Sequence, residues 1–274
     1  MASMSSNKLN VTHREHTLQI AYFIRHGEKG TALYIHGLGC SKSDFMDAVN
    51  RAELRAYRLI AFDFPGCGSS PYPENLALGM DDLVEITDKV VSALSVDDFV
   101  IIGHSMGGLV ALLYAERYGE HVKGFINVEG NLALEDCFFS REVSQHSFTH
   151  FTTTGFNTMK DRLAQSENKG FRKYAESLET SASERAFFDY CPSLVAYSEH
   201  GNLIQRFIAL KIPKLFVYGS ENRSSLSYLP RLQGSGCEVV EIPQSNHFPG
   251  YDNPAAYYRT IAAFLEKNIS FLDN

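Results

Sequence analysis

DDFVII at residues 97–102, GHSMGG at 103–108 and LVALLYAERYG at 109–119 decide the fold of this chain. The first stretch is an apolar run of strand length and the third has the spacing of a helix, so together they predict a buried strand followed by a helix. The glycine-rich stretch between them matches G-x-S-x-G with Ser105 at its centre, and that pattern carries meaning only between a strand and a helix. A sharp turn at this point strains the backbone of the central residue and presents its hydroxyl at the start of the helix. Ser105 is therefore the candidate nucleophile.

On both sides of this segment, apolar runs alternate with amphipathic stretches, as a parallel sheet with crossover helices requires. The predicted strands are 17–24, 31–35, 57–64, 97–102, 124–129, 212–219 and 237–242, and the predicted helices are 43–54, 80–94, 109–119, 224–233 and 253–266. The alternation fails over 131–210, which reads as mostly helical. We therefore expect an α/β core at 1–130, an inserted helical cap, or lid, at 131–210, and the rest of the core at 211–274.

The composition excludes several classes of protein. The chain has 274 residues with 32 acidic and 25 basic side chains, a formal charge of -7, and no run of Lys or Arg, which argues against nucleic acid as a partner. Five cysteines without a CxxC pair suggest neither a disulfide framework nor a zinc site. No metal-ligand spacing appears, and GHSMGG lacks the lysine of a phosphate-binding loop, so we expect no metal and no cofactor.

The termini and apolar runs bear on location. The first residues are polar and lack the apolar segment of a signal peptide, and no stretch of about 18 apolar residues occurs. We expect a cytoplasmic protein, a monomer or homodimer, that does not bind membranes and whose partner is a small-molecule acyl substrate.

A serine nucleophile needs a base and backbone donors for an oxyanion. His247 is the preferred base, because QSNHFPG follows the last predicted strand at the sheet edge where Ser105 also lies. His104 is assigned to packing, since the tight turn should direct its side chain away from the cleft. HGLG at 36–39 follows strand 31–35, so the amides of Leu38 and Met106 are the predicted oxyanion hole.

These motifs, with DFPGCGSS at 63–70, resemble those of serine hydrolases of the α/β-hydrolase fold superfamily, and the resemblance covers nearly the whole chain. It implies an α/β fold with a mostly parallel eight-stranded sheet flanked by helices, a helical cap inserted after strand six, and the order serine, acid, histidine. Serine as nucleophile argues against the dehalogenases of similar fold, which use a carboxylate there.

The acid departs from the usual family pattern. Members most often carry Asp three residues after the glycine that ends strand seven, where this chain has Asn222. Some members place the acid after strand six instead, where INVEGN supplies Glu129. An amide can hold an imidazole but cannot stabilise its positive charge as a carboxylate does. Glu129 is therefore the favoured acid, with Glu221 and an Asn222-based triad as the alternatives.

The predicted activity is cleavage of a carboxylic ester, or of an amide or thioester, with a small to medium hydrophobic substrate and an acyl-enzyme intermediate. Four phenylalanines of the cap are expected to select the acyl or alcohol group: Phe138, Phe139, Phe148 and Phe151. Carbon–carbon bond hydrolases, aminopeptidases and perhydrolases use the same triad and remain alternatives. A small-molecule receptor of this fold with little or no turnover is another, to which the atypical Asn222 gives weight.

Overall fold

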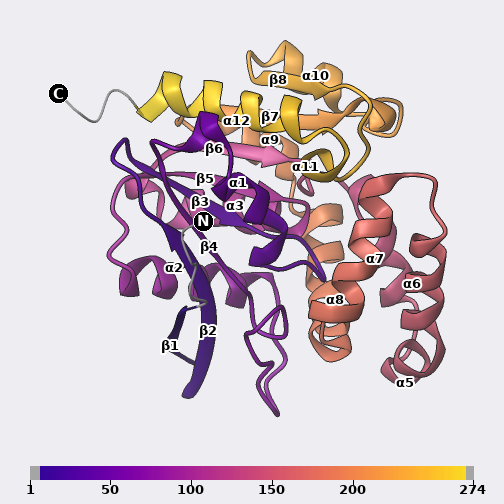
Figure 1. Cartoon of the computed structure of the whole chain (residues 1–274). Helices are drawn as coiled ribbons and strands as arrows, with labels where there is room; N and C mark the ends of the chain where they lie inside the picture. Colours follow the sequence, from indigo (N-terminus) through magenta and orange to yellow (C-terminus); the bar gives the residue numbers. More distant parts are fainter. Residues whose placement is uncertain (1–6, 270–274) are drawn as a thin grey trace.

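The computed structural model describes residues 7–269 and contains one eight-stranded sheet in the order β1-β2-β4-β3-β5-β6-β7-β8 (Figure 1). The strands are β1 Asn7–His13, β2 His16–Arg25, β3 Thr31–Ile35, β4 Arg58–Phe62, β5 Phe99–His104, β6 Val122–Val128, β7 Lys214–Gly219 and β8 Glu238–Ile242. Strands β3 to β8 pair in parallel, whereas β2 is antiparallel to both β1 and β4. The predicted α/β fold with a mostly parallel eight-stranded sheet is confirmed.

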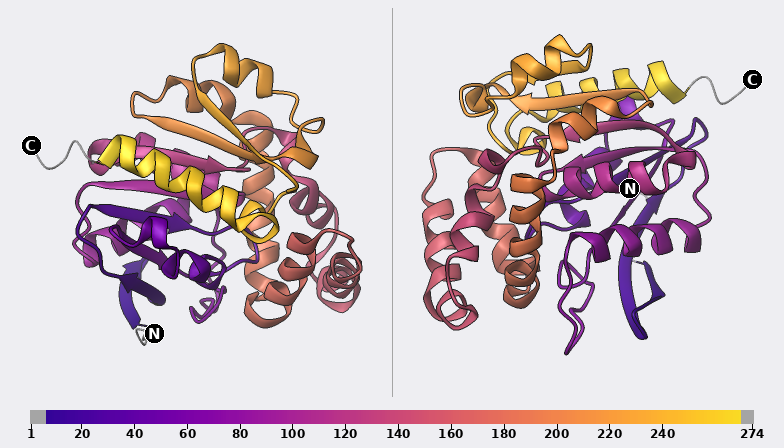
Figure 2. Two further views of the ribbon diagram at one scale, coloured as in Figure 1. Left: turned by 45° about the horizontal axis from the view of Figure 1, so that its top comes forward. Right: turned by 180° about the vertical axis from the view of Figure 1, so that it is seen from behind.

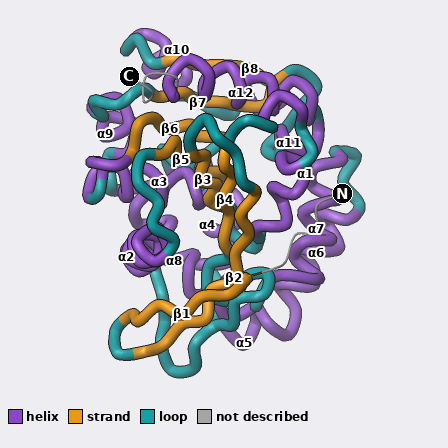
Figure 3. The backbone as a smooth tube through the Cα atoms, turned by 60° about the vertical axis from the view of Figure 1, so that its left-hand side comes forward, coloured by secondary structure: helices purple, strands orange, loops and turns teal. Residues whose placement is uncertain are grey.

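Helices cover both faces of the sheet (Figure 3). Helices α2 (Met80–Ala93) and α3 (Met106–Arg117) pack on one face and α12 (Pro254–Ile269) on the other, with the shorter helices α1 Met46–Val49, α10 Leu229–Gly234 and α11 Pro249–Asp252 at the periphery. The alternation along β3 shows the two faces, because Leu33 and Ile35 join the core under α2 and α3 while Ala32 and Tyr34 join the core under α12. Both faces of the parallel strands are thus buried, which explains their continuous apolar runs.

A helical segment connects β6 to β7. It contains a 3-10 turn at Leu134–Asp136, α4 Phe138–Ser144, α5 Phe148–His150, a π-helical turn at Phe151–Gly155, α6 Phe156–Ala164, α7 Lys169–Ser181, α8 Glu184–His200 and α9 Leu203–Ala209. These elements, here called the inserted helices, lie mostly beyond one end of the sheet (Figures 1 and 2). Within residues 134–209 the named elements are all helices or helical turns.

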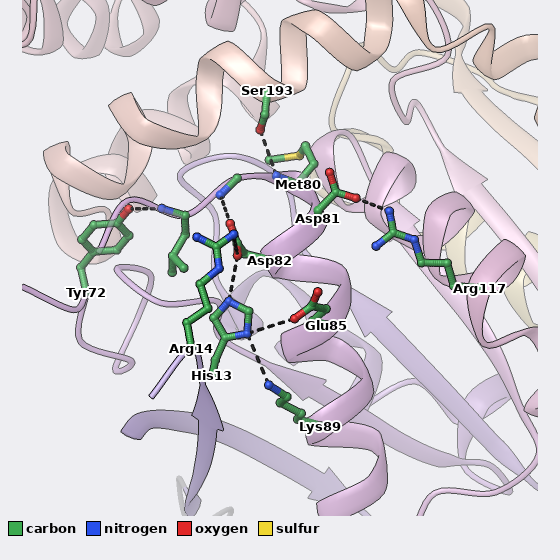
Figure 4. Close-up of polar contacts among 12 residues, drawn as sticks. His13, Arg14, Tyr72, Met80, Asp81, Asp82, Glu85, Lys89, Arg117 and Ser193 are labelled. Atoms are coloured by element: carbon green, nitrogen blue, oxygen red, sulfur yellow. Dashed lines mark hydrogen bonds and ion pairs between the residues drawn. The ribbon is translucent and has the colours of Figure 1, made fainter. Parts of the chain in front are cut away.

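Helix α8 is tied to the core near the start of α2 (Figure 4). The Met80 N–H donates to Ser193 Oγ at 2.9 Å, and the Tyr197 hydroxyl donates to Asp81 at 2.9 Å. The Tyr72 hydroxyl lies 2.8 Å from the Asp189 carboxylate. One side of the inserted helices is therefore fixed to the core by hydrogen bonds in addition to apolar packing.

Strand β1 is an element that the sequence reading did not predict. Its burial alternates along its whole length, and Val11 and His13 toward its end are buried. The wholly buried His13 places Nε2 2.8 Å from Asp82 Oδ1, and Asp82 Oδ2 also accepts from the Gly79 N–H at 2.8 Å, which caps α2 (Figure 4). In the sequence, a buried polar residue such as His13 looks like a surface residue, so the alternation of apolar and polar residues that indicates a strand could not be recognised.

Two predicted helices were wrong in their extent. The stretch 43–54 forms a 3-10 turn at Lys42–Phe45, the four-residue α1 and a second 3-10 turn at Ala52–Leu54, because Arg51 adopts an extended conformation (φ -75°, ψ 125°). The helix predicted at 224–233 begins only at Leu229, since Pro230 lacks an N–H and fits only the first turn of a helix.

Among residues 7–269, no helix is both long enough and apolar enough to span a membrane.

Candidate active site

Ser105 occupies a strained turn between β5 and α3. Its backbone angles are φ 53° and ψ -124°, a conformation that costs a non-glycine residue about 1–3 kcal/mol. The flanking glycines allow the chain to pass closely: a Cβ on Gly103 would lie 2.3 Å from the Gly107 carbonyl oxygen, and one on Gly107 would lie 2.3 Å from the Ile35 carbonyl oxygen. The turn therefore needs glycine at both positions and holds the serine at the N-terminus of α3.

His247 and Glu129 meet in the loops that follow β8 and β6. Nδ1 of His247 lies 3.2 Å from Glu129 Oε2, and both residues are buried, each with 4% of its surface exposed. A proton on Nδ1 that is donated to this carboxylate leaves Nε2 of the ring as an acceptor for a hydroxyl proton. Ser105 and His247 line the same cavity.

Three donors hold the Glu129 carboxylate. Its Oε1 accepts from the Gly219 N–H at 2.7 Å. Its Oε2 accepts from Asn222 Nδ2 at 2.8 Å and also faces His247 Nδ1. The backbone of Glu129 has a positive φ of 47°. The Glu129 N–H donates to the Val217 carbonyl at 2.9 Å, which fixes the backbone of the acid against β7. The carboxylate is thus oriented from the main chain and from two side chains.

The two alternative acids lie elsewhere. Asn222 contacts Glu129 and not the imidazole, so the amide at the usual acid position acts as a donor to the carboxylate that replaces it. Glu221 is exposed, and its Oε2 accepts from Asn246 Nδ2 at 3.2 Å. Of the three candidates, Glu129 is the one whose carboxylate the structure brings to His247.

The two predicted oxyanion donors lie beside Ser105. Leu38 follows Gly37, where an added Cβ would lie 3.1 Å from Ser105 Cβ. Within residues 7–269, the Leu38 N–H has no hydrogen-bond acceptor, and its carbonyl accepts from the Tyr174 hydroxyl at 2.8 Å. Met106 is the first residue of α3, so its N–H lacks an acceptor within the helix. Among the described residues neither N–H group donates to an acceptor, so both can bind an oxygen.

His104 does not point away from the cleft, which corrects the expectation for this side chain. It lines the cavity with Ser105, and Nε2 of its ring lies 2.8 Å from the His247 carbonyl oxygen. Burial, together with the neighbouring His247, lowers the pKa of His104 to about 3, so the ring is neutral and donates from Nε2 to that carbonyl. The sequence could not predict this contact, because His104 and His247 are 143 residues apart and come together only in the folded chain.

The cavity around Ser105, here called the inner cavity, has a volume of about 20 Å³. Besides Ser105, His104 and His247, its lining comprises Gly37, Leu38, Cys40, Asn131, Asp136, Phe138, Phe139, Ser140, Tyr174, Leu194 and Phe248. Phe138 and Phe139 stand in the wall as expected, but Phe148 and Phe151 do not. The ring of Phe148 packs on Phe188 at 5.2 Å, and Phe151 is buried 5.8 Å from the ring of Phe187. The aromatic wall instead gains Tyr174 and Phe248.

The cysteines and the possible metal ligands of residues 7–269 are the other reactive groups of the structure. The five cysteines are buried thiols, and burial raises the pKa of the Cys40 thiol in the cavity wall well above its usual value, which keeps it protonated. No group of three or more His, Cys, Asp or Glu side chains is arranged to hold a metal ion in the described part of the chain.

The family of the chain follows from comparison with known sequences. The sequence profile of the alpha/beta hydrolase fold matches residues 33–254, and the chain belongs to this family. A 1-acylglycerol-3-phosphate O-acyltransferase of Arabidopsis thaliana is 25% identical over 88% of this chain and 67% of its own length. A putative esterase/lipase of Mycoplasma pneumoniae is 24% identical over 89% of this chain and 92% of its own length. The chain is an esterase-like member of the family.

Solved structures show the same fold. A structure from a study of carboxylesterases of Nitrososphaera gargenis has a TM-score of 0.79 at 18% identity and covers 97% of this chain and 100% of its own. A thermophilic esterase of Thermogutta terrifontis has a TM-score of 0.76 at 18% identity, covering 96% of this chain and 99% of its own.

Proposed function

We propose that this chain hydrolyses carboxylic esters with a small to medium hydrophobic acyl group through an acyl-enzyme on Ser105. The observation that carries the proposal is the contact between His247 Nδ1 and Glu129 Oε2, made where His247 shares a cavity with a strained serine. A serine hydroxyl is a weak nucleophile until a correctly oriented base removes its proton.

The reaction proceeds in two halves. Ser105 Oγ attacks the ester carbonyl carbon while His247 Nε2 takes the hydroxyl proton, and His247 then gives that proton to the leaving alcohol oxygen as the ester C–O bond breaks. Water next attacks the acyl-enzyme, again losing a proton to His247, and the proton returns to Ser105 Oγ when the acid departs. Glu129 stabilises the imidazolium formed in each half.

Negative charge on the carbonyl oxygen is stabilised by the Leu38 and Met106 N–H groups. Met106 directly follows Ser105, Leu38 lines the same cavity as Ser105, and the N-terminus of α3 adds its partial positive charge there. Losing one such donor costs about 100-fold or more in rate in related chemistry, so this electrostatic contribution is large.

The inner cavity supports the proposed acyl group. Its walls are mainly aromatic and aliphatic, which suits an apolar acyl chain. Phe138, Phe139, Tyr174 and Leu194 all belong to the inserted helices, which would therefore act as a cap over the acyl group.

A fluorophosphonate probe read by intact mass, with p-nitrophenyl esters from acetate to dodecanoate, tests the proposal. Rapid one-to-one labelling lost in Ser105→Ala and a maximum in kcat/KM at short or medium chains would support it. Labelling without turnover of any ester would favour the other acyl chemistries of this triad. Absence of labelling together with tight binding of a small molecule would replace the proposal with a receptor.

A further inference from the structure

A second pocket is also lined by His247. It has a volume of about 350 Å³, and we call it the outer pocket. Its lining comprises Glu129, Glu135, Asp136, Phe138, Phe171, Asn222, Ser225, Leu226, Asn246 and His247. It shares Asp136, Phe138 and His247 with the inner cavity, so the two spaces meet at the proposed catalytic base.

This position suits the leaving alcohol of the proposed reaction. The base must deliver a proton to the alcohol oxygen, so the alcohol lies against His247 when the ester bond breaks. The inner cavity holds Ser105 and the free Leu38 N–H, which receive the carbonyl end of the substrate. The outer pocket does not contain Ser105 but does contain His247, and it is large enough for a small alcohol.

The charged side chains around the outer pocket are acidic. Glu129, Glu135 and Asp136 line it, and within the described part of the chain neither Lys nor Arg lines the outer pocket or the inner cavity. The Glu135 carboxylate is held by the Ser227 N–H at 2.7 Å and the Ser227 hydroxyl at 3.0 Å, and Asp136 Oδ1 accepts from the Tyr228 hydroxyl at 3.1 Å. These neutral donors orient the carboxylates without cancelling their charge.

An exposed aromatic ring stands at the junction of the two spaces. Phe138 is 42% exposed and is one of two large hydrophobic side chains that the described residues leave exposed, the other being Met46. Its ring meets that of His247 edge to face at 4.9 Å, and the half-buried Phe171 lines the same pocket. Aromatic faces attract cations, most strongly where carboxylates add to the negative potential.

We propose that the outer pocket binds the leaving alcohol of the substrate and that this alcohol carries a positive charge, as a quaternary ammonium alcohol does. The inference rests on the proposed ester hydrolysis and names its substrate class. Cationic alcohols are attracted by Glu135, Asp136 and the face of Phe138, whereas alcohols that carry a phosphate, sulfonate or carboxylate are repelled and find no cationic partner in the pocket.

Three esters that share one acyl group but differ in their alcohol distinguish the effect of the alcohol's charge on turnover from the effect of its size. Butyrylcholine is cationic, 3,3-dimethylbutyl butyrate is its neutral isostere, and 2-sulfoethyl butyrate is anionic. We expect kcat/KM to be about tenfold higher for the cationic than for the neutral ester, and lowest for the anionic one. The cationic advantage should shrink between low salt and about 0.5 M salt as the carboxylates are screened. A neutral ester that equals or exceeds the cationic one overturns the inference.

Matched variants locate the effect. Glu135→Gln should lower the ratio of cationic to neutral turnover, and Phe138→Leu should lower it while keeping an apolar side chain of similar bulk. Glu142→Gln is the control, because Glu142 is an acidic residue of α4 that pairs with Arg162 and does not line the pocket, so the ratio should stay at the wild-type value. A ratio that responds equally to Glu135→Gln and Glu142→Gln also overturns the inference.

Binding to Ser105→Ala protein separates this inference from the proposed function. Calorimetry with butyrylcholine and with 3,3-dimethylbutyl butyrate measures the charge preference without turnover. If Ser105→Ala binds the cationic ester more tightly and the wild type turns over none of the esters, the cation-binding role of the outer pocket is supported and the proposed hydrolysis is rejected. Turnover of all three esters at similar rates, with no preference in binding, rejects the outer pocket and sustains the hydrolysis.

Discussion

Glu129 and His247, 118 residues apart in sequence, place a carboxylate oxygen 3.2 Å from an imidazole nitrogen in the buried loops after β6 and β8. Asn222, at the position after β7 where relatives more often carry the acid, donates to the same Glu129 oxygen at 2.8 Å. The carboxylate at His247 thus comes from the loop after β6, and a side-chain amide from the segment after β7 supports it.

Replacing Glu129 with Gln should lower kcat by about 100-fold or more, because a neutral amide neither stabilises the imidazolium nor fixes the Nδ1 proton. Steady-state kinetics on the best p-nitrophenyl ester would measure it. Glu221→Gln is the matched control, since its carboxylate faces Asn246 and should matter far less. A larger loss in Glu221→Gln than in Glu129→Gln would show that the acid had been assigned to the wrong residue.

Acid should destabilise the protein partly through His104. The pKa of His104 is lowered to about 3 by burial and by His247, while an unfolded histidine titrates near pH 6.5. The unfolded state therefore takes up the proton first, and this contribution to stability is present above about pH 6.5 and is lost as the pH falls toward 3. Urea unfolding at pH 7.5 and pH 5 should show a smaller fall in the free energy of unfolding for His104→Gln than for the wild type. An equal fall in both would contradict the prediction.

Removing the Asp82 carboxylate should cost far more stability than removing its neighbour. Asp82→Ala leaves the buried His13 without its 2.8 Å partner and uncaps the Gly79 N–H, which should lower the free energy of unfolding by about 3 kcal/mol. Asp81→Ala removes only a half-exposed carboxylate that contacts Arg117 and Tyr197, and should cost about 1 kcal/mol or less. Chemical denaturation of both variants measures the difference, and similar losses would show that the burial of His13 does not depend on Asp82.

The charge preference of the outer pocket should rise with pH. Burial raises the pKa of Asp136 to about 7, so its carboxylate gains charge between about pH 6 and 8. Tyr228 and Glu135 act on this carboxyl group, and Glu129 and His247 line the same pocket. His247 takes part in the turnover of both substrates, so it does not change their ratio. The ratio of kcat/KM for butyrylcholine to that for its neutral isostere should therefore increase over this range. A ratio that stays level in the wild type, or that climbs equally in Asp136→Asn, would count against Asp136.

The sequence predicted the sheet and the turn at Ser105 well because each depends on local pattern, and the position of Glu129 after a strand could be recognised in the same way. Glu129 follows an apolar strand and precedes Gly130, and both features are visible within six residues. The partners of His13 and His104 could not be predicted in this way, since Asp82 lies 69 residues from His13 and the His247 carbonyl 143 residues from His104. Likewise, the inserted helices carry many aromatic residues, and only packing decides that Phe139 reaches the cavity while Phe151 turns into the helical core.

Around Ser105 the proposed oxyanion donors belong to the main chain, whereas the pocket walls consist of side chains. This difference affects how such an enzyme can change its substrate preference. The donors proposed to hold the oxyanion are backbone N–H groups, which no substitution at Leu38 or Met106 other than proline removes. Half of the residues that line each pocket belong to the single stretch between β6 and β7. New substrate preferences can therefore arise by point changes at these lining positions, Glu129 excepted, while the backbone donors are kept.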